Sequence, residues 1–108
     1  MTILRIHGPF LFGTTDKLND AAAGLDGFNP IVIVRLRNMT VIDATGLHAL
    51  EQFSAQLRRS GRTLLMCGAR HQPARFLAKA EFIDEIGREN IVPHVEAALA
   101  RARELAPR

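Results

Sequence analysis

The stretch IVIVRLRNMTVIDATGL, residues 31–47, decides the fold that this sequence can adopt. Its first part, Ile31-Val32-Ile33-Val34, is an unbroken run of β-branched residues, which is typical of a strand buried on both faces, as in the centre of a parallel sheet. Its last part, Asp43-Ala44-Thr45-Gly46, resembles a helix start, because aspartate is a preferred N-cap residue. The stretch therefore predicts a buried strand and, after a connection, a helix that packs on the same sheet.

The segments after this stretch continue the alternation of strand and helix. Leu47, Leu50, Phe53 and Leu57 have helical spacing, and Ser60-Gly61 ends that helix. The later elements that the pattern predicts are a buried strand at 63–67, a helix that starts near Pro73, a connection with a short turn at 82–87, a short edge strand at 90–93, and a last helix that starts at Val95 and runs to about Leu105.

The segments before this stretch predict a strand over residues 3–7 and a second short strand over residues 10–12. Gly8-Pro9 lies between them and indicates a turn or bend. A helix with an apolar face follows, through Leu18, Ala21, Ala22 and Leu25. The whole pattern predicts one domain over residues 1–108 of the α/β class, with about four helices against a mixed, mostly parallel central sheet.

Composition agrees with one globular domain and excludes several other classes of protein. Hydrophobic residues make up 47% and charged residues 23% of the chain, unlike a disordered sequence. The net charge of +3 is spread over arginines that alternate with acids, so we expect no nucleic-acid partner. No apolar run is long enough to span a bilayer, so we expect no direct membrane insertion of this domain. The single cysteine, Cys67, lies in an apolar run and is expected to be a buried, inert thiol.

The sequence offers no pattern for catalysis or for a cofactor. His7, His48, His71 and His94 have no spacing typical of a metal site, and no glycine-rich phosphate-binding motif occurs. Asp43, Thr45 and His48 lie close in sequence, but they lack a nucleophile elbow and an oxyanion partner. We therefore expect no catalytic residues, no metal and no cofactor, and hence no enzyme.

The segment Ile42-Asp43-Ala44-Thr45-Gly46-Leu47, after its apolar strand, resembles the STAS domain family. That family includes bacterial anti-sigma factor antagonists and the cytoplasmic C-terminal domains of SulP (sulfate permease) anion transporters. The transporter branch is more similar, because this chain also has Gly8-Pro9 followed by apolar and aromatic residues and Gly13. Residues 36–39, 82–84 and 89–91 resemble the same branch, so the resemblance covers almost the whole chain.

The resemblance points to one loop as the functional site. It implies an interaction or anion-binding surface made of Asp43, Ala44, Thr45, Gly46, Leu47 and His48. Thr45 matches the residue that kinases phosphorylate in the antagonist branch, which makes it the phospho-acceptor candidate, and Ala44 replaces a common serine. The residues alone also allow a simpler hypothesis, in which Asp43 accepts an N–H from Thr45 or Gly46 and only caps the helix. Both hypotheses stay open at this point.

The resemblance implies a non-catalytic regulatory or docking domain of a SulP-type sulfate or anion transporter. Such a domain would itself be soluble and would lie on the cytoplasmic side of the inner (plasma) membrane as part of a larger membrane protein. Its expected partners are the transmembrane part of its own transporter, a second copy in a homodimer, or a cytosolic regulatory protein. The alternative is a free-standing anti-sigma factor antagonist that phosphate on Thr45 switches off. Gly8-Pro9 and Ala44 favour the transporter.

Overall fold

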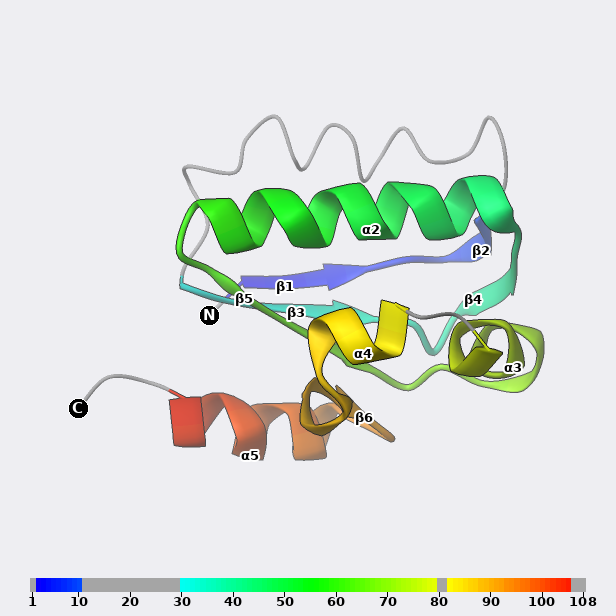
Figure 1. Ribbon diagram of the computed structural model, residues 1–108. Helices are drawn as coiled ribbons and strands as arrows, with labels where there is room; N and C mark the ends of the chain where they lie inside the picture. Colours follow the sequence, from blue (N-terminus) through cyan, green and yellow to red (C-terminus); the bar gives the residue numbers. More distant parts are fainter. Residues whose placement is uncertain (1, 11–29, 80–81, 106–108) are drawn as a thin grey trace.

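The computed structural model describes residues 2–10, 30–79 and 82–105 of the chain (Figure 1). Its strands are β1 (Thr2–Arg5), β2 (Gly8–Phe10), β3 (Ile31–Arg35), β4 (Met39–Ile42), β5 (Thr63–Cys67) and β6 (Ile91–Val92). Its helices are α2 (Ala44–Arg59), α3 (His71–Lys79), α4 (Phe82–Ile86) and α5 (Val95–Leu105), with a 3₁₀ helix η2 (Arg88–Asn90) before β6.

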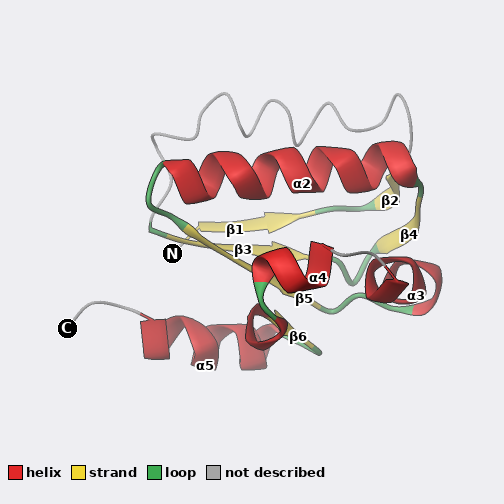
Figure 2. Cartoon of the chain, viewed as in Figure 1, coloured by secondary structure: helices red, strands yellow, loops and turns green. Residues whose placement is uncertain are grey.

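The described strands form one sheet of four and a separate pair, and Figure 2 shows the pair beyond the ends of β1 and β3. The larger sheet has the order β1-β3-β5-β6, and β2 pairs with β4. All these pairings are parallel, so among the described strands the sheet is parallel throughout and not mixed. The predicted α/β class is confirmed. The central position of β3 and the edge position of β6 are confirmed as well.

Side chains of β3 alternate between two hydrophobic clusters on opposite faces of the sheet. Val32 and Val34 pack with the cluster that α2, α3 and α4 cover. Ile31 and Ile33 pack with the cluster that α5 covers. Alternation follows from the period of two residues in a strand. The four β-branched residues are all buried because both faces are covered.

The two longest described helices lie on opposite faces of this sheet (Figure 1). Helix α2 buries Leu50, Phe53 and Leu57 along one side, at the spacing that the sequence predicts. Helix α5 buries Ala98 and Ala102, whose small side chains let the helix approach the strands closely. The sheet is thus the middle layer of three. In the described residues, no helix is both long and apolar enough to cross a membrane.

The N-terminal strands differ from the prediction. The first strand ends at Arg5, and Gly8-Pro9, predicted as a turn between strands, lies inside β2. The register between β2 and β4 shifts between Gly8 and Pro9, and Gly8 has a φ of 73°, which a glycine adopts without strain. The predicted bend is therefore an irregularity within a strand. Of the second predicted strand, residues 11 and 12 lie outside the described part of the chain, as does the predicted helix at residues 18–25.

Two elements after residue 35 also differ from the prediction. Residues 39–42 were expected to be a connection, but they form β4, in which Met39 and Ile42 are buried and Thr40 is exposed. Residues 82–87 were expected to be a connection with a short turn, but they contain the helix α4, with Phe82 and Ile86 buried in the core. The other predicted elements, α2, β5, α3, β6 and α5, are confirmed within a few residues.

The packing predicts that a buried leucine and an exposed leucine contribute differently to the stability of the fold. Leu57 of α2 is fully buried, whereas 37% of Leu105, the last residue of α5, is exposed. Leu57→Ala should lower the free energy of unfolding by about 2–5 kcal/mol, because it leaves a cavity in the core. Leu105→Ala is the matched control and should cost less than about 1 kcal/mol. Urea denaturation of both variants measures the difference, and equal losses would contradict this account of the core.

Candidate functional site

The candidate loop starts where β4 ends and α2 begins. Asp43 has an extended backbone and is the N-cap of α2, and its Oδ1 accepts the backbone N–H of Gly46 at 2.8 Å. This bond satisfies one of the four N–H groups that a helix start leaves without a partner. The main chain continues the cap, because the N–H of Leu47 donates to the carbonyl of Asp43 at 2.9 Å. The capping contact expected from the sequence is therefore confirmed, with Gly46 as the donor.

The six candidate residues are close together but differ in what they offer a partner. Ala44, Thr45 and His48 are exposed. Gly46 is buried, and Leu47 packs partly against the core. Asp43 is half-buried and occupied by its cap. The surface available for contact is thus a small patch of three side chains, held at the start of a helix 16 residues long.

Gln72 of α3 holds the strand that leads into this loop. Its side-chain Oε1 accepts the N–H of Ile42 at 2.8 Å, and its Nε2 donates to the carbonyl of Ile42 at 2.8 Å. The N–H and C=O of one strand residue point to the same edge, so the amide of Gln72 takes the place of a neighbouring strand. β4 is thereby fixed on the edge that β2 leaves free, one residue before Asp43. No motif or periodicity in the sequence points to Gln72.

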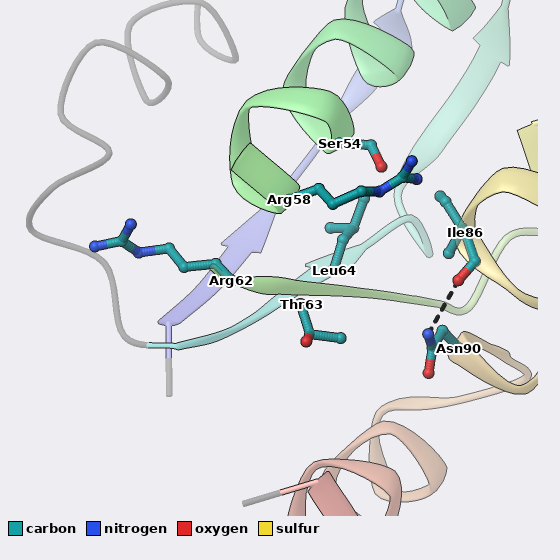
Figure 3. Close-up of a pocket in the computed structure, with 7 residues that line it drawn as sticks. All are labelled: Ser54, Arg58, Arg62, Thr63, Leu64, Ile86 and Asn90. Atoms are coloured by element: carbon teal, nitrogen blue, oxygen red, sulfur yellow. Dashed lines mark hydrogen bonds between the residues drawn. The ribbon is translucent and has the colours of Figure 1, made fainter. Parts of the chain in front are cut away.

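A small polar pocket lies near the other end of α2 (Figure 3). Its volume is about 140 Å³, and Ser54, Arg58, Arg62, Thr63, Leu64, Ile86 and Asn90 line it. Asn90 is already used within the protein: its Nδ2 donates to the carbonyl of Ile86 at 3.0 Å, and its Oδ1 accepts from Nε of Arg101 at 3.1 Å. Ligand pockets usually measure about 300–1,000 Å³. This pocket is therefore a gap between packed elements and not a candidate ligand site.

The histidines and acidic side chains of the described residues do not gather into a metal site. His7, His48, His71 and His94 are all exposed. Within residues 2–10, 30–79 and 82–105, no group of three or more His, Cys, Asp or Glu side chains could hold a metal ion.

The thiol of Cys67 is buried, as the sequence predicts. Burial raises its pKa; the positive charge of Arg35 opposes this rise, and the negative charge of Glu96 adds to it. The thiol form is thus favoured over the nucleophilic thiolate.

Comparison with known proteins places this geometry in a family. The model of the family described as STAS domain matches residues 1–98. The low affinity sulfate transporter 3 of Stylosanthes hamata is 30% identical over 84 residues. That match includes 78% of this chain but only 13% of the plant protein, so the chain spans a small part of that transporter.

Solved structures show the same fold. A sulfate transporter family protein from Wolinella succinogenes is 36% identical, with a TM-score of 0.87 over 96% of this chain and 85% of that one. The STAS domain of a SulP transporter from Vibrio cholerae is 24% identical, with a TM-score of 0.85 over 96% of this chain and 81% of that one. The second likeness supports the fold alone, and the first extends to the sequence.

The cap at Asp43 should contribute to stability through one atom, the side-chain oxygen that accepts the N–H of Gly46. Asp43→Ala removes the acceptor for Gly46 and should lower the free energy of unfolding by about 1 kcal/mol, within a range of roughly 0.5–2 kcal/mol. Asp43→Asn keeps a side-chain oxygen at the same place and should stay within about 0.5 kcal/mol of the original chain. Thermal and urea unfolding of both variants measure this difference. A loss of the same size in Asp43→Asn would show that the carboxylate acts in some other way.

The contact of Gln72 predicts a local change in hydrogen exchange. Gln72→Ala leaves the N–H and C=O of Ile42 without partners, which should cost about 1–3 kcal/mol and speed the exchange of the Ile42 amide proton. Gln52→Ala, at an exposed position of α2, is the matched control and should change neither quantity. Amide exchange followed by NMR measures both variants. Unchanged protection of Ile42 in Gln72→Ala would refute the role assigned to Gln72.

Proposed function

Because the chain belongs to the STAS domain family, we propose that it is a non-catalytic regulatory or docking domain of a SulP-type sulfate or anion transporter. It modulates transport or assembly through protein contacts around the loop Asp43–Leu47. The observation that carries this proposal is the 36% identity to a sulfate transporter family protein over 96% of the chain. The 30% identity to a part of a plant sulfate transporter supports the same assignment.

The loop is suited to be a contact surface because its backbone is held in place and three of its side chains are exposed. Gln72 fixes the backbone at Ile42 and Asp43 fixes it at Gly46, so the contact surface between them is pre-organised before a partner arrives. Ala44, Thr45 and His48 are exposed on this fixed backbone. A preformed surface avoids part of the ordering cost of binding. In this proposal the primary partner is the transmembrane part of the same transporter; a second copy or a cytosolic regulator are other outcomes.

Thr45 is the residue at which a covalent change would alter this surface most. Its side chain is exposed in the first turn of α2, where the N–H groups of a helix start and the helix dipole favour negative charge. A phosphate there would gain those contacts and would be opposed by the carboxylate of Asp43. The added charge would change the docking surface without a change in fold. This is the step at which a free-standing anti-sigma factor antagonist would be switched off.

Fractionation of the source cells distinguishes the transporter domain from the free-standing antagonist. An antibody raised to this domain should detect, on a blot of separated membranes and cytosol, a much larger band in the membrane fraction. A cytosolic band at the 11.9 kDa of this chain would overturn the proposal. It would support the antagonist instead, and phosphate on Thr45 would then be sought by mass spectrometry.

Paired surface substitutions test the loop itself in the transporter that carries this domain. Ala44→Glu places a bulky charge on the proposed contact surface, whereas Ala100→Glu makes the same change at an exposed position of α5. Neither should unfold the domain, since both sites are exposed helix positions. Ala44→Glu should weaken the contact by about tenfold, equivalent to about 1.4 kcal/mol, and reduce uptake of labelled sulfate. Ala100→Glu should leave uptake unchanged, and equal uptake in both variants would eliminate the loop as the contact.

A further inference from the structure

A second pocket lies at the carboxyl ends of three neighbouring parallel strands, β3, β5 and β6. Its volume is about 350 Å³. Each strand contributes to its lining: Arg35 ends β3 and Arg37 follows it, and Cys67 ends β5 and is followed by Gly68 and Arg70. Pro93 and His94 follow β6, and Val95 and Glu96 begin α5. In open parallel sheets, the crevice outside the carboxyl ends of the strands is where ligands bind. The volume is within the range of about 300–1,000 Å³ that small-molecule sites occupy.

The lining of this pocket is strongly positive. It includes three arginines, Arg35, Arg37 and Arg70, against one carboxylate, that of Glu96. Within the described part of the chain, none of the three guanidinium groups forms an ion pair with a carboxylate. Arg5 lies beside Arg35 in the register of β1 and β3 and adds to the same positive field. With three arginines against one carboxylate in its lining, the pocket has an excess of positive charge, which attracts an anion.

His94 and the first turn of α5 add hydrogen-bond donors to the pocket, and Gly68 lets two of its loops lie close together. His94 caps α5, because its Nδ1 accepts the N–H of Ala97 at 3.1 Å, and its Nε2 can then carry the ring proton as a donor. Oε2 of Glu96 lies 3.3 Å from the same Nδ1. The N–H groups of Val95 and Glu96, in the first turn of α5, have no partner within the helix. At Gly68, which has a φ of +81°, an added Cβ would lie 3.4 Å from Arg37, so glycine lets the two loops approach closely here.

We propose that this pocket is a binding site for a small multivalent oxyanion, held by the guanidinium groups of Arg35, Arg37 and Arg70 and by the first turn of α5. Guanidinium groups bind the paired oxygens of sulfate, phosphate and carboxylate through two parallel hydrogen bonds. Because three positive charges face one negative charge, a doubly charged anion is favoured over chloride. The site is separate from the loop at Asp43, and its existence does not rest on the proposed transporter function.

An NMR titration of the chain with sodium sulfate tests this proposal, with chloride used to keep the ionic strength constant. The amide signals of Gly68, Val95 and Glu96 should shift and reach saturation. The double variant Arg37→Gln/Arg70→Gln removes two exposed cations from the pocket and should weaken the fitted affinity by about tenfold or more. The control variant, Arg75→Gln/Arg103→Gln, removes the same charge from exposed positions outside the pocket and should bind as the original chain does. Circular dichroism confirms that both variants are folded.

The outcomes separate a built site from general attraction. Phosphate and succinate are titrated in the same way, and saturation by either oxyanion with the same dependence on Arg37 and Arg70 would also support the site and identify the preferred chemistry. Shifts that do not saturate for any of the three anions would overturn the proposal. Equal weakening in both double variants would overturn it as well, because the effect would then come from net charge. Saturating shifts at the start of α2 in place of the pocket would likewise contradict it.

Discussion

The burial of β3 on both faces is the constraint on which the rest of this structure depends. Val32 and Val34 need cover on one side, and Ile31 and Ile33 need it on the other. A shift of one residue in the register with β1 or β5 would exchange the two sets, so the pairing is tightly specified. One helix cannot cover both faces, and therefore α2 and α5 have to lie on opposite sides of the sheet. The neighbours of β3 are parallel to it, and parallel strands need crossover connections, whose helices cover the faces of the sheet.

The same constraint determines where the pocket of Arg35, Arg37 and Arg70 and the loop at Asp43 lie. Parallel strands all end at the same edge, so the segments after β3, β5 and β6 meet there although they are far apart in sequence. The α5 side of β3 carries Ile31, Ile33 and then Arg35, since residues two apart share a face. The apolar pattern thus ends in a cation where the core ends and solvent begins. On the other side, the chain continues through β4 into α2, and this places Asp43 at a helix start.

The elements predicted correctly are those with a strong and repeated pattern. β3 and α2 follow from the β-branched run at residues 31–34 and from the helical spacing of Leu50, Phe53 and Leu57, because burial imposes both patterns directly. β4 was missed because its four residues pair only with β2 among the described strands, so that Met39 and Ile42 are buried while Thr40 remains exposed. α4 was missed because five residues are too few to establish a helical period.

In the candidate sites too, contacts between residues close in sequence could be predicted, whereas contacts between distant residues could not. The cap by Asp43 could be predicted, since donor and acceptor are three residues apart and local geometry decides the contact. Gln72 could not, because it lies 30 residues from Ile42 and a single glutamine in a helix carries no periodic signal. The convergence of Arg35, Arg37 and Arg70 was equally out of reach, because in the sequence these arginines belong to a mixed-charge surface and only the parallel sheet brings them to one pocket. Local chemistry therefore fixes how α2 begins, whereas topology determines which distant residues line the pocket.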